Sequence, residues 1–270
     1  MSGSFADHAI IITGASDGIG AEIARQLADE GAWLALGARR GHELDLVAQD
    51  CIARGGRALV IPTDVTDRTQ CDHLAARTLE SYGKIDVLIC NAGLRAHFAF
   101  DGKADPAVFD RVMRVNYLGA VNSAGAALPG LRQSRGRVGV MSSLAGKTGV
   151  PYRTAYAASK HALHGFFDSL RIELADSGVS VTLVCPGFVH TGPRVEAIGA
   201  DGEPIDAEAL VRPDAMPAAA CARGTIDALR RRRREVVMTP NSRLMQVMKA
   251  LAPSLVDRRA ERTMRRTAHS

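Results

Sequence analysis

Tyr156 and Lys160 lie four residues apart, a spacing that suits proton transfer. The residues around them have the pattern of a helix, and positions i and i+4 share one helix face, so the phenol and the ammonium can point into one site. An isolated phenol gives up its proton only near pH 10, and a nearby cation favours the phenolate. We therefore expect Tyr156 to exchange a proton with a carbonyl or hydroxyl oxygen, supported by Lys160. The alternative is a surface Tyr/Lys pair without function.

Three glycines, Gly14, Gly18 and Gly20, separate the first apolar segment of the chain from the first helical pattern. Glycine permits the tight turn and the close backbone approach that a pyrophosphate needs, and the helix that follows offers free N–H groups. Because the turn comes after the first strand of an alternating β/α pattern, we interpret it as a nucleotide-binding turn rather than a plain Gly-rich connection.

The motifs of the chain resemble those of the short-chain dehydrogenase/reductase family. Residues 13–20 match its TGxxxGxG turn, residues 91–93 its NAG motif, residues 156–160 its YxxxK, and residues 186–191 its PGxxxT segment. The resemblance runs from about residue 9 to residue 191. Within the family, residues 142–147 and 165–171 look like the branch of 11β-hydroxysteroid dehydrogenase type 1 and its dehydrogenase/reductase relatives. We do not infer from this resemblance that the chain has the membrane anchor or the steroid specificity of those relatives.

This resemblance implies the catalytic set Asn116, Ser143, Tyr156 and Lys160. The serine stands 13 residues before the tyrosine, and the asparagine 27 residues before the serine, as in the family. In that family the serine holds the substrate oxygen. The asparagine holds a helix kink and a water that relays protons to the lysine.

The same resemblance implies which residues contact the cofactor. Asp64 and Val65 match the adenine-contacting pair, and Val189 and Thr191 match the residues that meet the nicotinamide carboxamide. The full predicted set is Gly14, Ser16, Asp17, Gly18, Ile19, Gly20, Arg39, Arg40, Asp64, Val65, Asn91, Ala92, Gly93, Tyr156, Lys160, Pro186, Gly187, Val189 and Thr191.

The end of the second predicted strand favours NADP(H). Ala38 stands where NAD enzymes of the family carry the Asp that bonds the ribose 2′-OH, and Arg39 follows it. A guanidinium is planar, always charged and able to bond two oxygens of a 2′-phosphate. Asp17 argues the other way, because many NADP(H) members have a basic residue there, so NAD(H) stays the alternative. For Arg40, cofactor contact and plain surface charge both stay open.

The expected reaction is hydride transfer between NADP(H) and the carbonyl or secondary alcohol of a hydrophobic small molecule, with reduction as the default direction. Two alternatives stay open: a non-catalytic NADP(H)-binding redox sensor, and a peripheral membrane protein that binds through a basic tail. The residues expected to shape the substrate pocket are Leu94, Arg95, Ser143, Leu144, Tyr152 and Phe188, with the loop 187–217.

Apolar segments that alternate with amphipathic ones position these residues. The predicted strands are residues 8–13, 32–37, 58–61, 86–90, 137–141, 179–185 and 235–239, and the predicted helices are 19–30, 44–54, 70–81, 106–131, 154–175 and 218–234. This order predicts an α/β, doubly wound Rossmann fold of one domain, with about seven parallel strands and helices on both faces. We expect a catalytic domain over 1–240, with short helices in the loop 187–217, and a basic helical tail over 241–270.

The positive charge gathers at the C-terminal end. Residues 223–270 hold 13 Lys/Arg against 4 Asp/Glu, including five consecutive arginines from 230 to 234, while the whole chain has a net charge of +5. A solvated helix end with a solubilising tail is the plainer interpretation, and weak contact with anionic lipid is the second. No nucleic-acid partner is expected, because no recognised module or aromatic platform accompanies the charge.

The five cysteines include no CxxC pair and are odd in number, which predicts buried thiols rather than disulfides or a metal site. No apolar stretch reaches 18 residues and no signal peptide opens the chain, so we expect a cytoplasmic protein. The family resemblance also implies that the protein forms a homodimer or a homotetramer.

Overall fold

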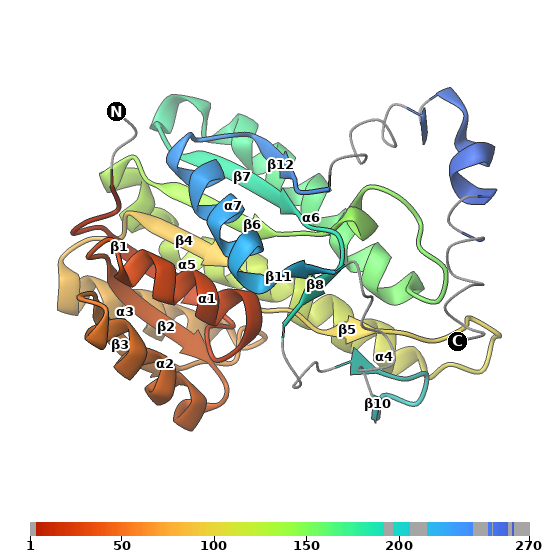
Figure 1. Cartoon of the computed structure of the whole chain (residues 1–270), viewed down its shortest axis with the longest axis horizontal. Helices are drawn as coiled ribbons and strands as arrows, with labels where there is room; N and C mark the ends of the chain where they lie inside the picture. Colours follow the sequence, from red (N-terminus) through yellow and green to blue (C-terminus); the bar gives the residue numbers. More distant parts are fainter. Residues whose placement is uncertain are drawn as a thin grey trace.

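One parallel sheet of seven strands forms the centre of the computed structural model, which describes residues 4–191, 197–205, 215–239, 248–249, 251–258 and 261. The strands are β1 (Ala9–Thr13), β2 (Trp33–Ala38), β3 (Arg57–Pro62), β4 (Val87–Cys90), β6 (Arg137–Met141), β7 (Ser180–Cys185) and β12 (Glu235–Val237). Their order across the sheet is β12-β7-β6-β4-β1-β2-β3 (Figure 1). The predicted fold class is confirmed.

The strands are rich in apolar residues because helices cover both faces of the sheet. All five residues of β1 are buried. In the register of β1, Ile12 stands beside Leu36 of β2 on one side and Ile89 of β4 on the other.

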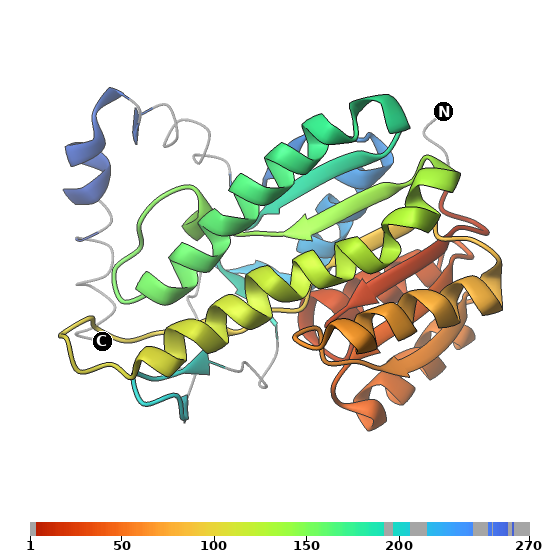
Figure 2. The same ribbon diagram turned by 180° about the vertical axis from the view of Figure 1, so that it is seen from behind.

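The helices form one layer on each face of the sheet. The front layer of Figure 1 holds α1 (Gly18–Ala28), α2 (Gly41–Ala53) and α7 (Ala218–Arg230), which share one apolar cluster with the sheet. Figure 2 shows the opposite layer, with α3 (Arg68–Tyr82), α5 (Gly119–Ser134) and α6 (Thr154–Glu173) packed on a second cluster. Each layer therefore buries an apolar helix face on its own side of the sheet.

One long helix was expected over 106–131, and the structure divides this segment. It contains α4 (Pro106–Met113), a single π-helical turn (Arg114–Leu118) and then α5, which continues past Pro129 to Ser134. A π turn holds one residue more than an α-helical turn, and such turns occur often at functional sites. The buried side chain in this turn is that of Asn116.

The order of the strands reverses next to β1. The chain moves outward from β1 to β2 and β3, then returns to place β4 on the other side of β1. In open parallel sheets, ligands bind beyond the carboxyl ends of the strands at such a switch point. Here that position lies between the turn after β1 and the NAG segment after β4.

The segment after β7 forms short strands in its described parts, residues 187–191, 197–205 and 215–217, and the remainder of the loop in which short helices were expected lies outside the described residues. In the described residues, β8 (Val189–His190) pairs with β11 (Met216–Pro217), and β9 (Ala197–Ile198) pairs with β5 (Arg95–Ala96) and β10 (Pro204–Ile205). The helical tail predicted over 241–270 lies mostly outside the described residues. From its described part, the Lys249 ammonium donates to the carbonyl of Lys147 at 2.9 Å. Among the helices described, none combines the length and the apolar character needed to cross a bilayer.

Three of the five consecutive arginines are tied into the fold rather than simply solvated, and one of them is Arg234, which donates to the Asp168 carboxylate at 3.1 Å. Arg230 pairs with Glu30 of the segment after α1, and with Asp227 of its own helix. Arg232 donates to the carbonyls of Gly178 at 2.9 Å and Arg135 at 2.7 Å. These contacts fasten the turn between α7 and β12 to the neighbouring loops.

Candidate active site

A cavity of about 320 Å³ opens at the carboxyl ends of the strands. Most of the predicted site residues line it: Gly14, Ser16, Asp17, Gly18, Ile19, Arg39, Arg40, Asp64, Val65, Asn91, Ala92, Gly93, Leu94, Arg95, Ser143, Tyr156, Lys160, Pro186, Gly187, Phe188, Val189 and Thr191. Four predicted residues lie outside its described lining, namely Gly20, Asn116, Leu144 and Tyr152. The motifs read from the sequence therefore meet in one place.

The glycine turn after β1 packs directly against the segment after β4. Gly14 has a φ of 64°, and a side chain on it would stand 2.7 Å from the Cα of Ala92. A side chain on Gly20 would overlap the carbonyl oxygen of Gly14. Gly20 thus packs against the back of the turn, and it does not line the cavity. Asn91 locks the two segments together, because its Nδ2 donates to the carbonyls of Thr13 and Gly14, each at 3.0 Å.

The carboxylate of Asp17 is engaged at the start of α1. Its Oδ1 accepts the N–H of Gly18 at 2.6 Å, which caps the helix. Its Oδ2 lies 4.0 Å from a guanidinium nitrogen of Arg40, and that nitrogen also lies 3.4 Å from the hydroxyl of Ser16. Arg40 thus reaches back over the turn, and its charge opposes that of Asp17. Arg39 is exposed and lines the same part of the cavity.

Tyr156 and Lys160 lie together on α6, as their spacing predicted. The Lys160 nitrogen is 5.6 Å from the centre of the Tyr156 ring. The lysine side chain is only 4% exposed, and its Nζ donates to the carbonyl of Met141 at 2.7 Å. Burial lowers the pKa of the Lys160 ammonium, and the charge of Tyr156 opposes part of that shift. The ammonium is therefore held in place beneath the phenol.

Asn116 acts from behind the wall of the cavity. It is 1% exposed, its Oδ1 accepts the N–H of Leu94 at 2.6 Å, and its Nδ2 donates to the carbonyl of Leu94 at 3.0 Å and to the hydroxyl of Ser159 at 2.8 Å. A side chain on Gly93 would stand 3.3 Å from Oδ1 of Asn116 and 3.7 Å from Nζ of Lys160. Because Gly93 has no side chain, a small space stays open between the Asn116 amide and the Lys160 ammonium.

The two serines after β6 have different surroundings. Ser143 is half-buried, lines the cavity, and accepts the N–H of Ala145 through its hydroxyl at 3.1 Å. Ser142 is buried, and its hydroxyl lies 2.9 Å from Nε2 of His164. Both serines line the cavity, but the Ser142 hydroxyl is engaged by His164, which leaves Ser143 as the candidate to face a substrate.

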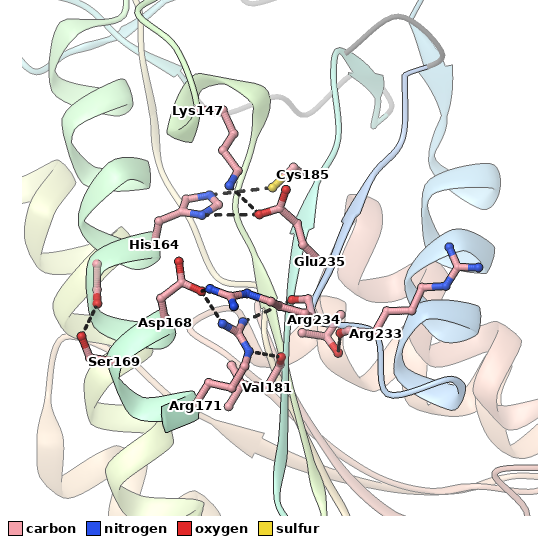
Figure 3. A network of polar contacts seen from close by, with 12 residues as sticks. Lys147, His164, Asp168, Ser169, Arg171, Val181, Cys185, Arg233, Arg234 and Glu235 are labelled. Atoms are coloured by element: carbon pink, nitrogen blue, oxygen red, sulfur yellow. Dashed lines mark hydrogen bonds and ion pairs between the residues drawn. The ribbon is translucent and has the colours of Figure 1, made fainter. Parts of the chain in front are cut away.

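A polar network behind Ser142 connects α6 to β7 and β12 (Figure 3). Lys147 and Glu235 form an ion pair at 2.5 Å, and Nδ1 of His164 lies 3.9 Å from the same carboxylate. The Cys185 sulfur is 3.8 Å from Nε2 of His164. Burial lowers the pKa of His164 to about 4, and the charge of Lys147 adds to that shift. The His164 ring is therefore neutral at pH 7 and serves as a hydrogen-bonding support.

Two residues expected in the substrate pocket lie elsewhere. The N–H of Leu144 donates to the carbonyl of Pro186 at 3.0 Å, so its backbone supports the Pro186–Gly187 turn from behind. Tyr152 has a left-handed backbone with a φ of 63°, and its ring packs against His97 with 5.8 Å between the ring centres. The positions of Leu144 and Tyr152 next to site residues in the sequence did not predict that both would lie outside the described lining of the cavity.

Three basic residues of the lining were missed by the sequence motifs: His97, Arg111 and Arg153. Two of them had a signal in the sequence. Residues 94–98 alternate apolar and polar, which places Arg95 and His97 on one face of a strand. Arg153 precedes Tyr156 by three residues, a spacing that puts both on one side of a helical turn.

All five cysteines are free and buried, as expected from their apolar surroundings. Burial raises the pKa of Cys51 to about 11 and those of Cys185 and Cys221 to about 12, so these thiols stay protonated. Across the described ranges, no three His, Cys, Asp or Glu side chains gather as metal ligands would.

The geometry fits a dinucleotide on two separate observations. The close approach of Gly14 to Ala92 leaves no room for side chains between the turn and the sheet. The cavity also extends from the ends of β2 and β3 to those of β6 and β7, past the switch point next to β1. An elongated ligand can therefore lie across the strand ends with one end at Arg39 and the other at Tyr156.

Known proteins share this chain's sequence and fold. The family model described as short chain dehydrogenase matches residues 8–199. A dehydrogenase/reductase SDR family protein 7-like of Dictyostelium discoideum is 35% identical over 260 residues, which cover 94% of this chain and 81% of the relative. A hydroxysteroid 11-beta-dehydrogenase 1-like protein of Xenopus tropicalis is 40% identical over 199 residues, 72% of this chain and 69% of the relative.

Solved structures agree with the sequence relatives. A short chain dehydrogenase/reductase from Burkholderia phymatum, in complex with NAD, superposes with a TM-score of 0.83 at 25% identity and covers 94% of this chain and 96% of that one. An alcohol dehydrogenase from the archaeon Thermococcus sibiricus, complexed with 5-hydroxy-NADP, gives a TM-score of 0.71 at 26% identity over 85% of this chain and 94% of that one. From its motifs, its fold and these relatives, the chain belongs to the short-chain dehydrogenase/reductase family of oxidoreductases.

Proposed function

We propose that the protein transfers a hydride between NADP(H) and the carbonyl or secondary alcohol of a small molecule. The observation that carries this proposal is the meeting of Ser143, Tyr156 and Lys160 in the same cavity as the glycine turn. A nicotinamide cofactor bound there supplies the hydride chemistry, while the protein supplies position and electrostatics.

Each catalytic residue has a role that its surroundings support. Ser143 and Tyr156 hold the substrate oxygen, and Tyr156 gives the proton to it in reduction or takes it in oxidation. Lys160 holds a positive charge beside the phenol from a buried position fixed by the Met141 carbonyl. Asn116 is a positioning residue, because it fixes the backbone of Leu94 and the Ser159 hydroxyl.

The preference for NADP(H) rests on the end of β2. Arg39 and Arg40 line the cavity where a ribose 2′-phosphate would lie, and the neighbouring residue is Ala38 rather than an acid. The objection raised by Asp17 weakens, because its carboxylate caps α1 and faces Arg40. The support for NADP(H) is therefore the pair of guanidinium groups at the end of β2, although Asp17 and Asp64 also line this end of the cavity.

Titration with NADPH and with NADH, followed by fluorescence, tests the proposal. We expect tighter binding of NADPH, and a loss of about tenfold in NADPH affinity alone for Arg39→Ala and for Arg40→Ala. Arg54→Ala is the matched control, since that exposed arginine pairs with Asp29 away from the cavity. A preference for NADH would contradict the assignment of the cofactor, and binding of neither would contradict the function.

The remaining expectations stand as proposals with their own tests. We propose a catalytic domain over 1–240 with the loop 187–217 at the substrate, and a basic tail over 241–270. We also propose a cytoplasmic homodimer or homotetramer without a nucleic-acid partner. Light scattering measures the assembly, and imaging of a tagged protein gives the location. Removal of 241–270 followed by liposome and DNA retention at rising salt tests the tail, because charge-driven binding fades with salt.

A further inference from the structure

Two arginines at the catalytic end of the cavity have no role in the chemistry proposed above. Arg95 and Arg153 line the same cavity as Ser143 and Tyr156. Arg95 lies on β5, which extends from the NAG segment, and Arg153 lies at the first turn of α6. Both positions are fixed by the elements that carry the catalytic residues.

Arg153 is held by its backbone and leaves its guanidinium available. Its carbonyl accepts the N–H of Ala157 at 2.7 Å. The guanidinium lies over the ring of Phe188, with its central carbon 4.9 Å from the ring centre. Its Nε is buried and has no hydrogen-bond partner among the described residues. A buried donor left unsatisfied is costly, so a ligand that accepts from this group would be bound strongly.

Arg95 faces the cavity because of the alternation along its strand. Leu94, Ala96 and Phe98 pack into an apolar cluster with α4. Arg95 therefore lies on the opposite face of the strand. One of its terminal nitrogens donates to the hydroxyl of Thr191 at 3.4 Å, a long bond that leaves other donors of the fork for a ligand.

The charge at this end of the cavity is positive. Among the described residues of the lining, the only carboxylates are Asp17 and Asp64, which follow β1 and β3. Burial lowers the pKa of Arg153, the charge of Arg95 lowers it further, and Tyr156 opposes the shift. Burial also lowers the pKa of His97, and the charge of Arg153 adds to that effect, so the neutral form of this ring is favoured. The two guanidinium groups therefore repel each other in a partly desolvated site.

The phosphates of the cofactor lie too far away to pair with Arg153. Phe188, beneath its guanidinium, follows β7, while the proposed 2′-phosphate site follows β2. Four strand spacings separate those two strands in the sheet order, which is roughly 19 Å. The pyrophosphate turn after β1 is three spacings away, roughly 14 Å.

We infer that the carbonyl substrate carries an anionic group, a carboxylate or a phosphate, which Arg153 binds together with Arg95 while the carbonyl oxygen lies at Ser143 and Tyr156. A guanidinium fork matches the geometry of either anion. The inference rests on the proposed function and names its substrate class. The apolar lining at Leu94, Val115 and Phe188 suits a hydrocarbon remainder, so the hydrophobic substrate expected from the sequence becomes one with a charged end.

Matched pairs of ketones test this inference with the intact protein and NADPH. The first pair is levulinate and methyl levulinate, and the second is hydroxyacetone phosphate and hydroxyacetone. Each pair differs in one charged group, and comparison of the two pairs tells a carboxylate from a phosphate. The variants are Arg153→Met, Arg95→Met and the charge-keeping Arg153→Lys, with Arg77→Met on the exposed face of α3 as the matched control.

The wild-type protein is expected to reduce at least one anion with a kcat/KM about tenfold above that of its uncharged partner. Arg153→Met should remove this difference through a higher KM for the anion, with kcat for the uncharged ketone unchanged. Arg153→Lys should restore part of it, because the charge returns without the fork. Equal effects of Arg153→Met on both members of a pair, or a wild-type preference for both uncharged ketones, would overturn the inference.

Calorimetric binding to the complex with NADP⁺ gives a second measurement that needs no turnover. Tighter binding of levulinate or hydroxyacetone phosphate than of its uncharged partner, lost in Arg153→Met and in Arg95→Met, supports the inference even when no probe is reduced. Equal binding, or binding of neither anion, overturns it. Failure of NADPH itself to bind marks instead the failure of the proposed function, and unchanged NADPH affinity in both variants shows that they fold.

Discussion

The side-chain amide of Asn116 holds both backbone hydrogen-bonding groups of a single residue, Leu94. Its Oδ1 accepts the Leu94 N–H at 2.6 Å, and its Nδ2 donates to the Leu94 carbonyl at 3.0 Å. Leu94 directly precedes Arg95, so one buried amide in the π turn fixes the wall that carries Arg95.

Replacement of this amide is expected to weaken both the fold and the activity. Asn116→Leu leaves the buried N–H and carbonyl of Leu94 without partners, at a cost of about 1–3 kcal/mol for each unsatisfied group. Urea unfolding and steady-state kinetics measure the two effects. Gln26→Leu is the control, since its amide bonds the Ala219 carbonyl away from the cavity, and it should cost about 1 kcal/mol with kcat unchanged. An equal fall in kcat for both variants would contradict a positioning role for Asn116.

Loss of the Tyr156 hydroxyl should affect catalysis and leave binding intact. Tyr156→Phe keeps the ring beside Lys160 but removes the proton donor, so kcat should fall by about a hundredfold or more while the NADPH affinity stays unchanged. Tyr82→Phe is the control, because its hydroxyl donates to the carbonyl of Leu34 near the amino end of β2, away from the cavity at the carboxyl ends of the strands. If Tyr156→Phe retained full turnover, the assignment of the proton donor would be wrong and a binding protein that senses redox state would become the better interpretation.

The glycine turn should tolerate no side chain. In Gly20→Ala the added Cβ would overlap the Gly14 carbonyl and stand 2.5 Å from Nδ2 of Asn91. We expect a loss of about 1–3 kcal/mol in unfolding free energy and NADPH binding weakened by about tenfold or more. Gly165→Ala tests the same exchange inside α6, where nothing lies within 4 Å of the new methyl group. That control should gain about 0.5–1 kcal/mol from the lower backbone entropy of alanine.

The buried ring of His164 should make stability depend on pH. Its pKa is lowered from 6.5 to about 4 in the fold, so the unfolded chain binds the extra proton between these values. The stability is therefore fully present above pH 6.5 and is lost as the pH falls toward 4, by about 2 kcal/mol between pH 7 and pH 5. Urea unfolding at the two pH values measures this loss. His164→Gln should remove it, while His73→Gln on the exposed face of α3 should leave it unchanged.

Sequence patterns predicted the sheet and the motif residues because both depend on local chemistry. The strands from 9 to 13 and from 180 to 185 are mostly apolar, and the glycine turn can be recognised from its own residues. The family resemblance implied a helix kink at Asn116, but its form as a π turn was not predicted, because the helical pattern runs through 114–118 without a break in its apolar spacing. Pro129 even suggests an earlier end than the one α5 has.

The substrate end could be predicted only in part, because it is built by long-range contacts. Arg153 meets Phe188 across 35 positions of sequence, and Arg95 meets Thr191 across 96. No local motif encodes such pairs. Tyr152 illustrates the same limit, since its left-handed backbone directs its ring to His97 of the lining, a contact that its neighbours in the sequence do not predict.

The π turn at 114–118 makes the site sensitive to insertions and deletions. A deletion of one residue there would restore a regular helix and keep the flanking residues in phase, because a π turn holds one residue more than an α-helical turn, yet it would change the direction of the side chains within the turn. Asn116 could then no longer face Leu94. Proteins redesigned from this scaffold with an idealised helix in that segment would fold and lose the wall of the pocket. The length of this one turn is therefore as much a part of the active site as the side chains are.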